Sequence, residues 1–187
     1  VRNSIEDEIK KDDNDINYVK WKEKTYARNI CNLDYNKVVK ANNYIKSKGY
    51  VKRKLTHELM RNVFKELKFD SKDYDFINSF LSVYYGIYPY IPNNSEQRDM
   101  DTIFYRVKEF NSQIKGNNTN DRYCPYFIYK IVENLFKDDE KKLNGINDFI
   151  HVQEEGTVKD RDEEWRKICK LYNAKYKDLS LVFTKTY

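Results

Sequence analysis

The sequence predicts a mainly α-helical protein, an irregular bundle of about six or seven helices that ends in a short extended C-terminal segment. Three observations support this fold class. Apolar residues recur at intervals of three and four residues along most of the chain after residue 55. The chain has 17 Tyr and 10 Phe, so aromatic rings can build a core although the mean hydropathy is only −0.94. Several of its five glycines and three prolines stand where helical segments begin or end.

The N-terminal residues 1–15 are predicted to form an acidic flexible arm, because they hold six acidic and three basic residues with only isolated apolar ones. Residues 16–187 are expected to form a single helical domain. Aromatic and aliphatic residues become dense from Ile16, and Gly49 ends the first helical segment. The chain begins with Val1 rather than Met, so we expect it to be part of a longer protein.

Two further helices are predicted in the middle of the chain. Thr56 is a suitable N-cap for a helix over residues 57–67. Ser71 can cap the next helix, which Gly86 would end. The prolines that follow bias their predecessors away from the helical conformation, so residues 87–94 are expected to form a loop with extended backbone.

The C-terminal half continues the helical pattern. A helix is predicted over residues 95–114, and a loop rich in Asn and Gly follows at 115–123. The next helix, over residues 125–136, has a proline in its first turn, where the missing N–H costs nothing. A short apolar piece at 143–150 and a helix that contains Trp165 complete the set. Alternation of apolar residues in the tail predicts a short strand or an extended segment there. The side chains expected to be buried together are those of Leu135, Trp165 and Ile168.

The sequence lacks the patterns of metal sites, enzymes and membrane proteins. Cys31, Cys124 and Cys169 are far apart and His57 and His151 stand alone, so neither a metal nor a cofactor is expected. There is no phosphate-binding glycine loop, nucleophile elbow or His-x-Glu pair, so we expect a protein that is not an enzyme. Without a signal peptide or a long apolar span, we expect an intracellular protein with no membrane partner.

The net charge of +5 is distributed unevenly along the chain. Residues 37–68 include ten basic and two acidic residues, a net charge of +8. Residues 138–164 include ten acidic and four basic residues, a net charge of −6. Stretches of opposite sign on one small protein suggest two surfaces with different partners.

The basic stretch is the strongest candidate for a binding site, at a turn around residues 46–54. Its cations flank Gly49 and the rings of Tyr44 and Tyr50. Cations beside aromatic rings bind phosphate backbones and unpaired bases. A lysine-rich surface that only aids solubility explains the same pattern. The candidate nucleic-acid-binding residues are Lys46, Lys48, Lys52, Arg53 and Lys54.

The acidic stretch contains a cluster that could face a basic protein partner. This cluster consists of Asp160, Asp162, Glu163 and Glu164. Negative charge in the first turns of a helix is favourable by itself, because the helix N-terminus carries partial positive charge. The cluster is therefore explained either by a partner or by the helix alone.

The order of several motifs is similar to that of a viral family. An aromatic-rich apolar helix from Tyr126 to Leu135 is followed, after a charged link, by Asp162, Trp165, Arg166, Lys167, Ile168 and Cys169. Upstream lie Leu59-Met60-Arg61, Tyr74-Asp75-Phe76-Ile77 and Gly86-Ile87-Tyr88-Pro89. Over roughly residues 52–175 the chain resembles the third late transcription factor of poxviruses and the related factors of other large cytoplasmic DNA viruses.

This resemblance implies a non-enzymatic domain that recruits or activates a viral RNA polymerase at late promoters. The implied partners are that polymerase or a companion transcription factor, with DNA as a candidate ligand. The implied location is the virus factory in the host cytoplasm, with packaging into the virion. The family carries a zinc ribbon near its N-terminus that nothing here matches, so either the ribbon lies before Val1 or the resemblance is misleading.

Two other interpretations fit the sequence. The chain could be a structural protein of the virion, a minor capsid or scaffolding component that binds capsid proteins through aromatic surfaces and has no transcription role. Alternatively, it could be an interaction domain of a host or parasite that shares only the composition of an A+T-rich genome. A four-cysteine ribbon upstream of Val1 would favour the transcription factor over the scaffold.

Overall fold

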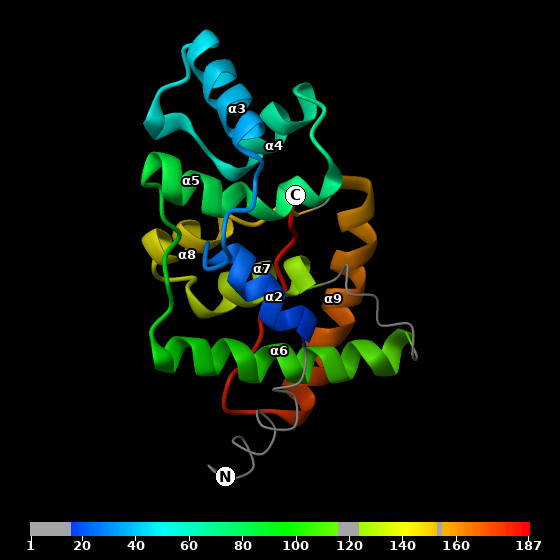
Figure 1. The fold of residues 1–187 in the computed structure, drawn as a ribbon. Coiled ribbons are helices and arrows are strands. Elements are labelled where there is room, and N and C mark those ends of the chain that lie inside the picture. Colours follow the sequence, from blue (N-terminus) through cyan, green and yellow to red (C-terminus); the bar gives the residue numbers. More distant parts are fainter. Residues whose placement is uncertain (1–15, 116–123, 153–154) are drawn as a thin grey trace. The chain divides into compact units, whose positions relative to one another are not determined.

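The computed structural model describes residues 16–115, 124–152 and 155–187, and this part of the chain is mainly α-helical, as predicted (Figure 1). It contains eight α-helices, two short 3-10 helices and no β-strand. The predicted acidic arm and most of the predicted loop at 115–123 lie outside the described residues. The α-helices are α2 (Ile16–Thr25), α3 (Tyr35–Ser47), α4 (His57–Glu66), α5 (Ile77–Tyr85), α6 (Asn94–Lys115), α7 (Cys124–Leu135), α8 (Glu140–Asn147) and α9 (Glu155–Lys175), and the 3-10 helices are η1 (Lys52–Lys54) and η2 (Ser71–Phe76).

The chain divides into two compact units. Unit 1 comprises residues 1–18, 92–143 and 152–187, and unit 2 comprises residues 19–91 and 144–151. The described part of each unit has buried apolar side chains of its own. The division of the sequence into an arm and one helical domain over 16–187 stays a prediction.

In unit 1 the long helix α6 contacts both α7 and α9. Its start is fixed by a reciprocal pair of hydrogen bonds, in which Asn93 Oδ1 accepts from the Glu96 N–H at 2.8 Å and Glu96 Oε1 accepts from the Asn93 N–H at 3.0 Å. This is a capping box, which satisfies two N–H groups that the helix itself leaves unpaired. The N-cap is therefore Asn93, two residues before the predicted start at Ser95.

The core of unit 1 is largely aromatic. Trp165 and Ile168 are fully buried, as predicted, whereas Leu135 is half-buried. The indole of Trp165 lies edge-on to the ring of Tyr126, with centroids 6.4 Å apart. Such edge-to-face pairs stabilise beyond the area that they bury. The predicted role of Trp165 as a core residue is confirmed.

The C-terminal tail of unit 1 is extended, and its backbone is held by side chains rather than by a β-ladder. Asn173 bonds both the N–H and the carbonyl of Leu181, at 2.8 and 2.6 Å. The Val182 N–H donates to Asn134 Oδ1 at 2.7 Å, and the Thr186 N–H donates to Asp162 Oδ2 at 2.9 Å. Two asparagines and one aspartate therefore bind the tail against α7 and α9.

A buried cation lies where the tail crosses α7. The Lys130 ammonium is fully buried and donates to the Thr184 carbonyl at 2.7 Å, with Glu133 Oε1 at 3.0 Å and Asp162 Oδ1 at 3.8 Å. Burial alone would raise the pKa of Asp162, but hydrogen bonds from Thr186 and Tyr126 and the charge of Lys130 lower it below its usual value. The carboxylate is thus ionised and paired.

Replacement of this buried lysine should destabilise unit 1. We expect Lys130→Met to lower the free energy of unfolding by about 3 kcal/mol, because it leaves buried carboxylates without their cation. The tail amides of Val182 and Thr186 should also exchange their hydrogens faster. Chemical denaturation and hydrogen exchange measure both effects, with Lys137→Met, an exposed lysine just after α7, as the matched control. Equal stability of the two variants would contradict the role assigned to the buried ammonium.

In unit 2 the helices α3, α4 and α5 and the 3-10 helix η2 pack around one hydrophobic cluster. The Thr56 hydroxyl accepts from the Leu59 N–H at 3.1 Å and starts α4, as predicted. Gly86 ends α5 in the left-handed conformation with φ +62°, also as predicted. The segment after residue 70 differs from prediction, because Asp70 rather than Ser71 is the N-cap, and it starts a 3-10 turn before α5.

A buried amide joins distant segments of unit 2. Asn78 Nδ2 donates to the carbonyls of Lys24, Thr25 and Phe149 at 2.9–3.2 Å, and its Oδ1 lies 2.7 Å from His57 Nδ1. Since the amide nitrogen faces carbonyls, the oxygen must accept, so His57 carries its proton on Nδ1. Burial lowers the pKa of His57 from 6.5 to about 4, against the opposing effect of the hydrogen bond to Asn78.

The buried histidine makes stability depend on pH. Because the pKa of His57 is lower in the folded state than in the unfolded state, the unfolded chain binds the proton more readily. The stabilising contribution of neutral His57 is therefore complete above pH 6.5 and is lost as pH falls toward 4. The loss should amount to about 3 kcal/mol. Denaturation between pH 7 and 4 measures it, and His57→Gln should flatten the curve. His151→Gln, which replaces a half-buried histidine bonded to Glu58, is the control and should keep the steep loss in this range.

Candidate nucleic-acid interface

The predicted basic turn connects α3 to α4 in unit 2. Lys48 is the C-cap of α3, and Gly49 follows in the left-handed conformation with φ +65°, which reverses the chain at little steric cost. Lys52–Lys54 then form η1, and the buried side chain of Leu55 anchors the end of the turn in the core. A glycine and a leucine therefore fix a run of cations on the surface between two helices.

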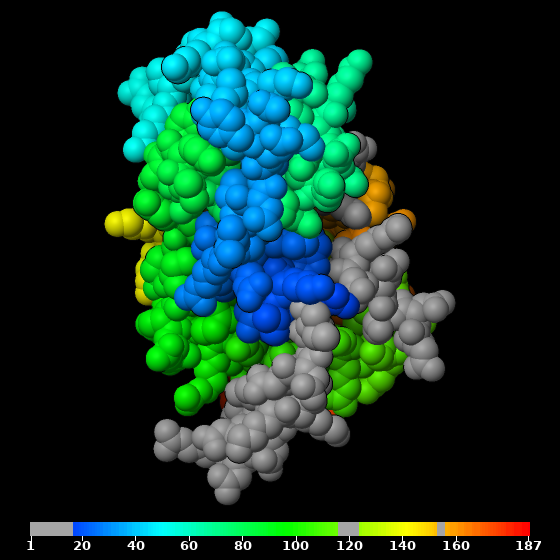
Figure 2. Space-filling view, viewed as in Figure 1, coloured from blue at the N-terminus to red at the C-terminus, as the bar shows by residue number. Residues whose placement is uncertain are grey.

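All five predicted cations are exposed and together form what we call the basic surface: Lys46, Lys48, Lys52, Arg53 and Lys54. Within the described part of the chain, no carboxylate pairs with any of them. Lys37, in the same unit, shows the contrast, because it bonds Asp73 at 2.6 Å and Asp70 at 3.2 Å. The segment that carries the basic surface, drawn in cyan, is visible on the surface of the chain in Figure 2. Its positive charge is thus uncompensated by the described carboxylates.

One of the two predicted rings, that of Tyr44, lies beside a cation of the basic surface. The Lys48 ammonium lies 5.5 Å from the centroid of the Tyr44 ring, and both Tyr44 and Tyr50 are half-buried. These two rings pack against the hydrophobic cluster of unit 2. They therefore support the turn more than they offer free faces to a ligand.

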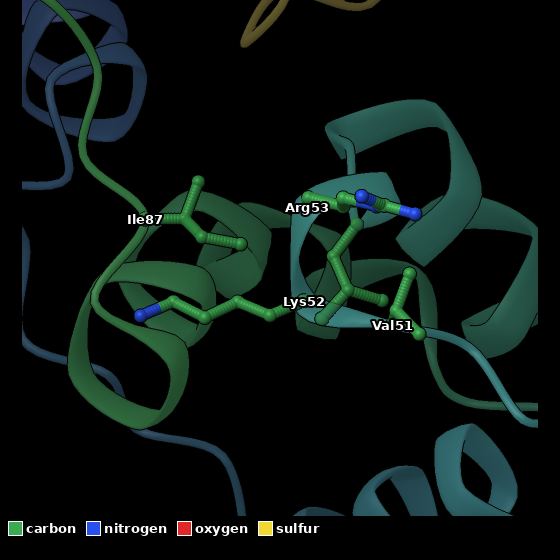
Figure 3. Close-up of a pocket in the computed structure, with 5 residues that line it drawn as sticks. Val51, Lys52, Arg53 and Ile87 are labelled. Carbon is green, nitrogen blue, oxygen red and sulfur yellow. The ribbon is translucent and has the colours of Figure 1, made fainter.

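An open depression of about 540 Å³ lies next to η1 (Figure 3). Its wall is apolar, apart from the two charged groups at its border. In Figure 3 the side chains of Lys52 and Arg53 point in opposite directions, with Ile87 above the stem of Lys52. The residues that line it are Val51, Lys52, Arg53, Leu55 and Ile87. Sequence reasoning identified the cations but missed the apolar wall, because Ile87 comes from a connector more than thirty residues away.

A cation and an aromatic ring both lie near Gly86, at the end of helix α5. A Cβ atom at Gly86 would lie 3.6 Å from Lys52 Nζ and 3.9 Å from Tyr88 Cε2. The Tyr88 side chain is 69% exposed, so its ring is open to solvent. The absence of a side chain at Gly86 thus leaves space between the ammonium and the ring.

The acidic cluster on α9 in unit 1 does not form a single acidic surface. Asp162 turns inward, where it is buried and accepts from the Tyr126 hydroxyl at 2.6 Å. Glu164 pairs with Lys115 at 2.8 Å. Asp160 and Glu163 are exposed among the basic side chains of the same helix. Glu163 also lies 3.7 Å from Arg166 Nε, in an exposed ion pair. The residues available to a partner are therefore Asp160 and, in competition with these ion pairs, Glu163 and Glu164.

The histidine, cysteine and acidic side chains of the described residues do not gather into a metal site. No three His, Cys, Asp or Glu side chains of this part of the chain come together as a metal site would require. Burial raises the pKa of the Cys169 thiol to about 12, so the thiolate is scarce at neutral pH. No helix in this part of the chain is long and apolar enough to cross a membrane.

The sequence of the chain matches a known protein family. Residues 3–176 match the family model described as Poxvirus Late Transcription Factor VLTF3 like. The chain belongs to this family. The match is longer than the resemblance at 52–175 and includes α2 and α3, and so the whole basic surface.

Curated relatives come from a large DNA virus. Zinc finger protein B385R of African swine fever virus, in the isolates Pig/Kenya/KEN-50/1950 and Warthog/Namibia/Wart80/1980, is 34% identical to the chain over 55 residues. The aligned part is 29% of this chain and 14% of each relative, so the chain matches about a seventh of their length. No solved structure matches the chain.

Proposed function

We propose that the chain is a domain of a viral late transcription factor that binds nucleic acid through the basic surface of unit 2. The observation that carries this proposal is the group of five exposed cations without a described carboxylate partner, in a member of the VLTF3-like family. A surface that serves solubility alone does not require its cations to be gathered on one turn. The similarity to a protein named zinc finger protein agrees with a ligand of this kind.

Binding at this surface would be mainly electrostatic. Lysine and arginine side chains that neutralise phosphates release condensed counterions, and this release supplies much of the affinity. Phosphate contacts position a protein without reading sequence. The basic surface would hold the nucleic acid, while promoter selection would come from other parts of the protein or from its partners.

We further propose that α9 contacts the viral RNA polymerase or a companion transcription factor. Asp160 and Glu163 are exposed there, and Glu163 and Glu164 are within reach once they leave Arg166 and Lys115. Exposed charges of this kind steer association and add little to the final affinity. The proposed role is non-enzymatic, and the proposed location is the virus factory in the host cytoplasm.

The nucleic-acid proposal predicts a specific loss of binding. Replacing all five residues of the basic surface by Ala should weaken DNA or RNA binding about tenfold or more at low salt. Each lost phosphate contact should lower the log–log salt slope by about 0.7 to 0.9. Fluorescence anisotropy at several salt concentrations measures both quantities.

A matched control removes the same charge elsewhere. The variant with Ala at five exposed lysines of unit 1 has the same net charge, and it should keep most of the affinity and slope. The control positions are Lys137, Lys141, Lys167, Lys170 and Lys185. Equal loss in both variants would show that net charge alone drives binding and would exclude the basic surface as the site.

The partner proposal is tested by pull-down from infected cells. We expect polymerase subunits or companion factors to be recovered at low salt and to be lost at high salt, because ions screen exposed charges. Asp160→Asn combined with Glu163→Gln should slow association, whereas Asp148→Asn, an exposed carboxylate of unit 2, should not. Recovery of capsid proteins at both salt concentrations, without polymerase, would favour the structural role in the virion instead.

A further inference from the structure

We propose that the basic surface and the adjoining depression bind an unpaired strand of nucleic acid, with a base against the depression and the exposed ring of Tyr88. This inference rests on the proposed function, because it names the form of nucleic acid that the same surface would hold. It adds an apolar component to the electrostatic one. The predicted ligand class is single-stranded DNA or RNA.

The first argument is the shape and chemistry of the depression. Its volume of about 540 Å³ lies in the range of sites that hold small organic groups. Val51, Leu55 and Ile87 supply apolar wall, and no carboxylate lines it. A flat, uncharged ring such as a base can cover such a wall, and a polyanionic backbone suits the cations at its border.

The second argument is the position of the cation relative to the ring. Lys52 Nζ and the Tyr88 ring both lie within 4 Å of one point beside Gly86. In single-stranded nucleic acid, base and phosphate alternate at short spacing along the chain, so a ring and an ammonium that both lie near Gly86 can contact a base and a neighbouring phosphate. Arg53 points away from Lys52 (Figure 3), so it would contact a different phosphate of the strand.

The third argument is that a duplex cannot use these features. In a duplex the faces of the bases are stacked on one another and only their edges are accessible in the grooves. A duplex could contact the cations but would leave the depression and Tyr88 unoccupied. Unpaired bases have free faces, and stacking them on aromatic side chains tolerates any sequence.

Binding to matched oligonucleotides tests the inference. The probes are a labelled single strand of about 12 nucleotides, its DNA duplex and an RNA strand of the same sequence. We expect the wild-type chain to bind the single strands more tightly than the duplex. Tyr88→Ala should weaken single-strand binding about fivefold or more and leave duplex binding unchanged. The DNA and RNA arms show which strand is preferred.

Two further variants control for structure and for loss of any tyrosine. Tyr88→Phe keeps the ring and should bind as the wild type does. Tyr35→Ala removes another tyrosine of unit 2, 76% exposed at the start of α3, and should have no effect.

The outcomes separate the two proposals. If single strands and duplex bind equally and Tyr88→Ala changes neither, this inference is overturned while the proposed function stands. If the wild-type chain binds none of the three probes, both are overturned. Weakening of duplex and single strand alike by Tyr88→Ala would also overturn it, because the ring would then not discriminate unpaired bases.

Discussion

The amide of Asn78 is the interaction on which the basic surface of unit 2 depends. Its nitrogen donates to the carbonyls of Thr25, the last residue of α2, and of Phe149, which follows α8. Its oxygen accepts from His57 at the first position of α4. Buried carbonyls without donors would each cost free energy, so this amide holds together segments that are distant in sequence. The turn that ends at Leu55 and Thr56 leads directly into that histidine. The presentation of the cations is therefore tied to a buried polar contact.

In unit 1 the structure depends on hydrogen-bond partners for the buried tyrosine hydroxyls and charged groups of the core. A core with many tyrosines must satisfy hydroxyl groups as well as bury rings. Tyr126 donates to Asp162, and Tyr172 accepts from Arg106, whose guanidinium also makes two hydrogen bonds to Asp178. The Arg106 hydrogen bond lowers the pKa of Asp178. A very polar sequence can thus form a dense interior when its buried charges are paired.

Local signals in the sequence predicted much of the fold. Thr56 and Gly86 act on their own helix ends, and their roles follow from side-chain chemistry and backbone freedom over a few residues. The burial of Asp162 could not be predicted from the sequence, because it depends on hydrogen bonds with Tyr126 and Thr186, which are distant from it in the chain. The hydrogen bonds of the Asn78 amide could not be predicted for the same reason. At the candidate site the cations were predicted from charge, whereas the depression required the connector at Ile87 to pack beside η1.

The position of Lys52 has a consequence for the entropy of binding. Its ammonium lies at the C-terminal end of α5, where the last carbonyls of the helix carry partial negative charge. A long flexible side chain that is already drawn to one place loses less rotational freedom when a ligand arrives. Helix α5 would thus act as an internal counter-ion, which keeps the cation oriented at the surface without neutralising it with a carboxylate.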